Sequence, residues 1–104
     1  MADYTEALLR ALLTTAGRSA FTHDDIYAVI DPTGNGAKQI RAFNLADGTR
    51  SQTQIAKQLK INSGNFSRTV GRWVERGILF RLGDGRDATL LHVYPIPAKR
   101  PKAK

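Results

Sequence analysis

The N-terminal segment, residues 5–16, places apolar side chains at the spacing of one helix face. Four leucines form this stripe, at Leu8, Leu9, Leu12 and Leu13. We predict a helix that ends at Gly17, because glycine readily adopts the left-handed conformation that closes a helix. Four leucines in six positions exceed what a small core covers, and a surplus apolar patch marks an interface. The stripe predicts a homodimer joined through this helix; the alternative is that the helix closes its own chain's core.

Two further helices are predicted before residue 50. The first begins at Thr22, since Thr22 and Asp25 have the spacing of a capping box, and it ends before Pro32. The second runs through Ile40 and Phe43 and stops at residues 47–48, where an Asp-Gly pair interrupts the pattern.

Residues 50–79 have the pattern of two helices joined by a short turn. Ser51 and Gln54 fit a second capping box, and Ile55 then lies on the inner face of the first helix. Asn62 is a good N-cap for the next helix, which we predict over residues 63–76. That helix carries a buried stripe at helical spacing, namely Phe66, Val70, Trp73 and Val74.

The opposite face of the 63–76 helix is short-chained, polar and basic. Short side chains permit close approach to the major groove of DNA, and Asn and Arg form bidentate hydrogen bonds with base edges. We predict a DNA-binding surface composed of Ser51, Thr53, Ser63, Gly64, Asn65, Ser67, Arg68, Thr69, Arg72 and Arg86. The alternative for Arg68 and Arg72 is that they are ordinary solvated charges.

A β-hairpin is predicted after the helix pair. Two β-prone runs, residues 78–82 and 88–94, flank an Asp84-Gly85 turn. Arg86 at the tip would reach the minor groove or the DNA backbone, unless it is a solvated turn residue. Residues 95–104 contain three prolines and four basic residues, and we predict that they form a disordered basic tail.

The net charge of +7 is unevenly distributed along the 104 residues. Residues 1–50 hold five basic and six acidic groups, a net charge of −1, whereas residues 51–104 hold eleven basic and three acidic groups, a net charge of +8. A strongly cationic half indicates a polyanionic partner.

Several classes of function are disfavoured by composition. The chain has no cysteine, which excludes disulfides, thiol nucleophiles and thiolate metal sites. His23 and His92 have no partners at metal-ligand spacing, so we interpret both as structural or solvent-exposed. We expect neither an enzyme nor a cofactor. No stretch approaches the ~20 apolar residues of a membrane span, and we expect a cytoplasmic, nucleoid-associated protein.

The helix pair and hairpin resemble the winged helix-turn-helix of MarR-like and related bacterial or archaeal regulators. The matching residues are Ile55-Ala56-Lys57-Gln58-Leu59, Ile61-Asn62, Phe66-Ser67-Arg68, Arg72-Trp73 and Gly77-Ile78-Leu79. The resemblance implies that Ser63, Asn65, Ser67 and Arg68 face bases and that Arg72 contacts a phosphate. Lys60 departs from the family, since many relatives have glycine at this turn. The C-terminal helix with which many relatives dimerise has no counterpart in this sequence.

We therefore expect an α+β winged helix-turn-helix domain over residues 1–94, with three N-terminal helices, the helix pair and a two-stranded wing. The expected function is sequence-specific binding of double-stranded DNA, in the service of transcriptional repression. Two alternatives remain. One is a DNA-binding adaptor in plasmid or viral partition or replication, and the other is a winged-helix protein-interaction module that binds no nucleic acid.

Overall fold

A computed structural model describes residues 2–34, 36–83 and 87–98 of the chain, with side chains from Tyr4 onward. Within these ranges there are five helices and three strands. Their order is α1 (Ala2–Ala20), α2 (His23–Ile30), α3 (Ala37–Leu45), β1 (Asp47–Ser51), α4 (Gln52–Leu59), α5 (Ser63–Glu75), β2 (Leu79–Leu82) and β3 (Thr89–His92). The expected α+β class is confirmed.

Capping residues fix the starts of α2 and α4, as predicted. The Thr22 hydroxyl accepts a hydrogen bond from the Asp25 N–H at 3.1 Å, and the Asp25 carboxylate accepts one from the Thr22 N–H at 2.9 Å. Ser51 and Gln54 form the same reciprocal pair at 3.1 and 2.8 Å. Each box satisfies two N–H groups that the helix itself leaves without an acceptor.

The sheet has three strands in the order β1-β3-β2, rather than the two strands predicted. The β2–β3 hairpin is confirmed, with Leu79 opposite His92 and Leu82 opposite Thr89. The additional strand, β1, pairs antiparallel with the other edge of β3 through an irregular register. It contains no apolar residue, so it carries no alternating pattern that marks it as a strand.

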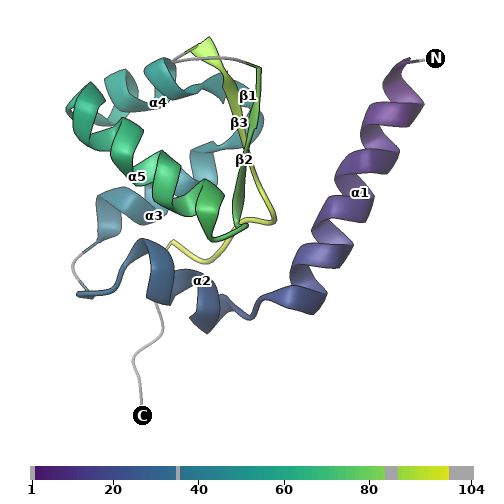
Figure 1. The fold of residues 1–104 in the computed structure, drawn as a ribbon, viewed down its shortest axis with the longest axis horizontal. Coiled ribbons are helices and arrows are strands. Elements are labelled where there is room, and N and C mark those ends of the chain that lie inside the picture. Colours follow the sequence, from purple (N-terminus) through teal and green to yellow (C-terminus); the bar gives the residue numbers. More distant parts are fainter. Residues whose placement is uncertain (1, 35, 84–86, 99–104) are drawn as a thin grey trace.

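The core lies between the sheet and the helices α2 to α5, which cover one side of the sheet (Figure 1). The predicted core residues Phe66, Val70 and Trp73 are confirmed, each being at most 2% exposed. Trp73 makes edge-to-face contacts with Phe43 and Phe66, at centroid distances of 5.8 and 6.3 Å. The Phe43–Trp73 contact joins α3 to α5.

Helix α1 stands on the other side of the sheet, apart from the remaining helices (Figure 1). It does not end at Gly17, and the predicted C-cap is wrong. Gly17 is a buried residue inside the helix, and a Cβ atom there would lie 2.7 Å from the Cβ of Val93. Glycine is thus required for close packing against the segment after β3, not for closing the helix.

The predicted disorder of residues 95–104 is wrong for the segment that follows β3. Ile96 is 5% exposed, its N–H donates to Asn44 Oδ1 at 2.9 Å, and its carbonyl accepts from Asn44 Nδ2 at 2.7 Å. The Tyr27 hydroxyl donates to the Pro97 carbonyl at 2.7 Å. A single apolar residue between two prolines gives no periodic pattern, so the burial of Ile96 could not be predicted from the sequence. Residues 99–104 lie outside the described ranges.

Candidate nucleic-acid interface

Helices α4 and α5 are joined by a tight turn over residues 60–62. Lys60 adopts the left-handed conformation, with φ 56°, and its N–H donates to the carbonyls of Ala56 and Lys57. This conformation costs a lysine about 1 kcal/mol. The Ile61 N–H donates to the Ala56 carbonyl at 2.9 Å, and Asn62 Oδ1 accepts from the Asn65 N–H at 3.0 Å. The predicted cap of α5 is therefore confirmed, and the turn holds α5 against α4.

The exposed face of α5 carries most of the predicted DNA-binding residues. Ser63, Asn65, Arg68 and Arg72 are exposed, whereas Gly64, Ser67 and Thr69 are half-buried. Arg68 Nη2 donates a hydrogen bond to Asn65 Oδ1, one helical turn toward the N-terminus. The structure thus brings together two of the side chains predicted to read bases.

The positive charge of the helix pair is not balanced locally. Residues 48–74 contain five basic residues and no Asp or Glu; the five are Arg50, Lys57, Lys60, Arg68 and Arg72. Arg50 pairs with the Asp47 carboxylate at 3.1 Å. The other four form no ion pair with another described residue. This concentration of unpaired cations attracts a polyanion.

Asp47 is held in its charged form at the edge of this region. Burial acts to raise the pKa of its carboxyl group, but hydrogen bonds from Thr49 and the adjacent Arg50 guanidinium outweigh burial and lower the pKa below its ordinary value. Asp47 therefore neutralises Arg50 over the whole physiological pH range. The cations available to a partner are those of α4, the turn and α5.

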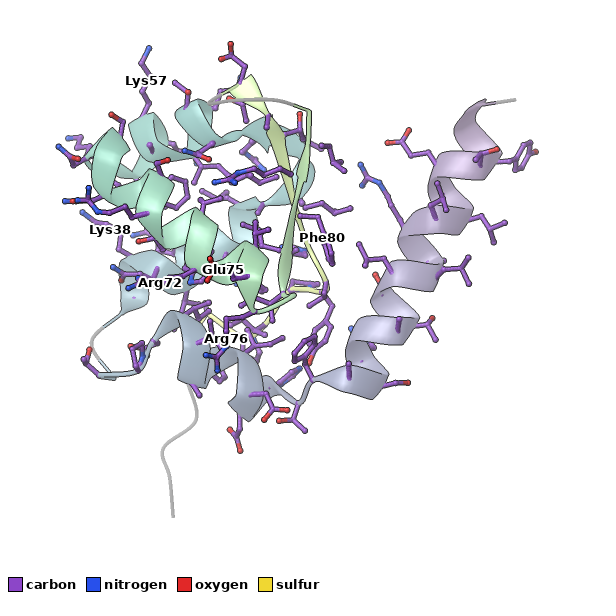
Figure 2. All side chains as sticks on the ribbon, in the orientation of Figure 1. Lys38, Lys57, Arg72, Glu75, Arg76 and Phe80 are labelled. Carbon is purple, nitrogen blue, oxygen red and sulfur yellow. The ribbon has the colours of Figure 1, made fainter. Side chains whose placement is uncertain are left out.

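Arg72 lies at the side of α5 that faces α2. Together with Thr69 and Arg76 it lines a groove of about 590 Å³ between α5, α2 and the loop after α2. Figure 2 shows Arg72, Glu75 and Arg76 along the C-terminal half of α5, while Lys57 projects from α4 at the far end of the pair. Basic side chains thus border the α5 face on two sides.

Two predicted site residues belong to the start of α4 and not to this face, and a third lies outside the described part of the chain. The Ser51 hydroxyl is engaged in the cap of α4, and Thr53 is half-buried in the first turn of that helix. Arg86 lies outside the described residues. Conversely, the sequence prediction omitted the exposed Lys57 and Lys60. The absence of Asp and Glu from residues 48–74 was the signal that could have identified them.

Gly71 has no structural reason to be glycine. It lies inside α5, where alanine is more favourable by about 1 kcal/mol, and its φ is not in the left-handed region. A Cβ atom at this position would have no neighbour within 4 Å. Packing within the chain therefore does not demand glycine here, whereas close approach of a partner to the helix backbone would.

The two histidines are structural or exposed, as interpreted from the sequence. His92 is buried on β3, with Nδ1 2.7 Å from the Phe43 carbonyl and its ring stacked on that of Phe43 at 5.3 Å. Burial lowers its pKa, which favours the neutral ring. His23 is exposed beside the Tyr94 ring. Across residues 2–34, 36–83 and 87–98, no three or more His, Cys, Asp or Glu residues are grouped so as to hold a metal ion.

Two further findings bear on function. In the described part of the chain, no helix combines the length and the apolar character needed to cross a membrane. Comparison of the chain with models of known protein families, with curated proteins and with solved structures found no match.

Proposed function

We propose that this protein binds double-stranded DNA by inserting the exposed face of α5 into the major groove. The observation that carries the proposal is the stretch of residues 48–74 without Asp or Glu, which folds into a helix pair and exposes serine, asparagine and arginine beside half-buried glycines on α5. The positive charge of this stretch suits a polyanion. The small size of its side chains allows close approach, at which asparagine and arginine can form hydrogen bonds with base edges.

The dimensions of α5 suit the groove. Its 13 residues extend about 20 Å at ~1.5 Å per residue, and the major groove is about 12 Å wide, enough to admit a helix. Gly64 and Gly71 leave the backbone of this face uncovered. In the bound state we propose that Asn65 and Arg68 exchange their mutual hydrogen bond for bonds to base edges.

The flanking cations have a different proposed role. Arg72 at the α2 side, and Lys57 and Lys60 on the α4 side, would contact phosphates on the two strands that border the groove. Phosphate contacts fix the position of a protein on the duplex but carry no sequence information. They supply much of the affinity and make it depend on salt.

The fold proposed for this arrangement is a winged helix-turn-helix, in which α4, the turn and α5 form the motif and the β2–β3 hairpin is the wing. The hairpin loop, residues 83–87, would lie on the minor groove or the backbone through Arg86. We propose a sequence-specific transcriptional regulator, acting as a repressor on the nucleoid.

The test begins with selection of bound duplexes from random DNA, followed by fluorescence anisotropy on the selected site. Arg68→Ala should cost about 1–3 kcal/mol and relax base preference at one position, because a base contact is lost. Arg72→Ala should weaken binding to all sequences about equally. Arg41→Ala on α3 removes an exposed charge of the same type outside the helix pair, and should leave selectivity unchanged. If both Arg68 and Arg72 variants retain full selective binding, the proposed face is wrong.

A further inference from the structure

Helix α1 turns a charged side chain toward the sheet and large apolar side chains toward solvent, the reverse of an ordinary surface helix. Arg10 points toward the sheet, where Nη1 donates to the Asp47 carbonyl at 3.1 Å and Nη2 lies 3.4 Å from the Glu6 carboxylate. Leu13 and Gly17, one and two turns on, lie on this same inner side. The large side chains left in solvent are apolar: Tyr4, Leu8, Leu9 and Leu12 are 83%, 61%, 60% and 57% exposed.

The outer side of α1 contains no charge between Tyr4 and Ala16. Arg18, near the C-terminal end of the helix, lies over the Tyr94 ring. At 100° per residue, the positions opposite Arg10, Leu13 and Gly17 are Tyr4, Thr5, Leu8, Ala11, Leu12, Thr15, Ala16 and Ser19. A surface helix ordinarily presents charged and polar groups to water and its apolar stripe to the core. The reverse arrangement leaves an apolar surface about 18 Å long, from Tyr4 to Ala16 at ~1.5 Å per residue, without a partner among the described residues.

We infer that α1 pairs with α1 of a second copy of this chain, antiparallel and about a two-fold axis. The homodimer predicted from the four leucines is thereby refined, because Leu13 belongs to the core of its own chain and Tyr4, Leu8, Leu9 and Leu12 form the contact. The outer side faces away from the body, so a second α1 can approach without meeting the sheet (Figure 1). The inference does not depend on DNA binding.

The identity of the partner follows from the complementarity of α1 with itself. In an antiparallel pair centred on residue 10, Leu8 lies level with Leu12 of the second copy at the centre of the contact, and Tyr4 lies level with Ala16. Large side chains thus oppose small ones at the ends, which is what interdigitation requires. A two-fold contact is necessarily between identical patches, and the antiparallel arrangement also opposes the helix dipoles favourably.

Charge restricts where a second copy can approach. Each chain carries a net charge of +7, so two copies repel each other over most approaches. The outer side of α1 is uncharged and lies across the sheet from the cationic helix pair (Figure 1). Pairing here keeps the two basic surfaces apart. One helix pair buries less than the ~1,200 Å² of a standard interface, so we expect a concentration-dependent dimer.

Sedimentation equilibrium tests the inference directly. The apparent mass of the wild-type chain should rise from 11.5 kDa toward twice that value as the protein concentration is raised. Leu8→Glu/Leu12→Glu should remain monomeric with unchanged circular dichroism, since both side chains are exposed. Leu82→Glu, a 48% exposed leucine on β2, is the matched control and should dimerise like the wild type.

The antiparallel register has its own test, which uses folded variants only. The chain has no cysteine, so Thr5→Cys and Thr15→Cys each introduce one thiol on the outer side of α1. Oxidising a mixture of the two proteins should give mainly the mixed disulfide, because residues 5 and 15 face each other.

Two results would overturn the inference: a wild-type monomer at the highest concentration, or preferential linkage of Thr5→Cys to itself. A dimer that binds no DNA would support the inference and refute the proposed function. A monomer that binds DNA selectively would do the opposite.

Discussion

The outer face of α1 and the exposed face of α5 are alike in one respect and opposite in another. Both are helix surfaces left in solvent, and neither offers an acidic side chain between Leu8 and Leu12 on α1 or between Ser63 and Arg72 on α5. The α1 face is leucine and alanine, whereas the α5 face is asparagine, arginine and glycine. The first is suited to another apolar helix and the second to a hydrated polyanion. One small domain thus has two surfaces that cannot compete for the same partner.

The two helices also differ in how they are held. The inner face of α5 places Phe66, Val70 and Trp73 in the core, so the helix is fixed along its length. Helix α1 is held at its C-terminal half by Gly17 against Val93 and at its middle by Arg10 against β1. A recognition surface needs the first kind of support, because base contacts tolerate little displacement. A helix that contacts another copy of the chain through apolar side chains can be held at only two points, as α1 is.

The largest expected difference between the two surfaces is their response to salt. Raising monovalent salt from about 50 to 200 mM should lower DNA affinity by about 10³–10⁵-fold if a dimer makes roughly 6–10 phosphate contacts. The dimer dissociation constant should not rise with salt, because the α1 contact contains no ion pair to screen and salt weakens the mutual repulsion of two chains of charge +7. Anisotropy and sedimentation at matched salt concentrations measure the two responses. Equal salt dependence of both equilibria would mean that the two surfaces are not distinct.

Two helix glycines sharpen the comparison at the level of single residues. Gly71→Ala should raise the free energy of unfolding by about 0.5–1 kcal/mol, since the new methyl group meets open space. Gly17→Ala should lower it by about 1–3 kcal/mol, because the methyl group meets Val93 at 2.7 Å. Urea denaturation of both variants gives the signs, and identical signs would contradict the packing argument.

Substitutions of Gly71 also test the proposed binding of DNA. Gly71→Gln should leave the fold intact and reduce DNA affinity by about tenfold, or about 1.4 kcal/mol, because a long side chain blocks close approach to the α5 backbone. Gly71→Ala is the matched control, with a smaller loss. Undiminished affinity in Gly71→Gln would show that DNA does not approach this part of the helix.

Sequence reasoning succeeded where the structural cause is local. The capping boxes at Thr22 and Ser51 and the cap at Asn62 depend on residues three positions apart, and all three are present. It failed where the cause lies far along the chain. Gly17 looked like a helix end because its neighbour Val93 is 76 positions away, and β1 is a strand only because β3 accepts it as a partner.

The candidate site was predictable to a similar degree. The buried stripe of α5 fixed which side chains are exposed, so the exposure of Asn65 and Arg68 followed from helical periodicity. The division of the leucine stripe could not be predicted, since Leu12 and Leu13 are adjacent and only the rotation of α1 about its own axis decides that Leu13 packs half-buried against the core while Leu12 stays exposed. The DNA-binding role itself stays a prediction.

The smallest expected effect concerns pH, and it distinguishes the sheet beneath α1 from the helix pair. His92 lines a cavity of about 140 Å³ together with Arg10 and Leu13 of α1. Burial lowers its pKa below the ordinary 6.5, and outweighs the opposing influence of the Phe43 carbonyl and the Asp47 charge. Below pH 6.5 the unfolded chain therefore binds a proton that the folded chain excludes, so the free energy of unfolding falls as pH falls toward the folded-state pKa.

The slope from this one group is at most about 1.4 kcal/mol per pH unit. Thermal melts between pH 7 and pH 5 should show it in the wild type and lose it in His92→Asn, whose amide can still donate to the Phe43 carbonyl. Asp47 contributes only at lower pH. The pKa of its carboxyl group is lowered in the folded chain, so the stabilisation that it provides is lost as pH falls below 3.8, the pKa in the unfolded chain. Residues 48–74 contain no histidine, Asp or Glu, so DNA affinity of the folded protein should be unchanged between pH 7 and pH 5. If the free energy of unfolding of His92→Asn still falls between pH 7 and pH 5, a group other than His92 causes the acid sensitivity. The sheet beneath α1 would then be no more sensitive to pH than the helix pair.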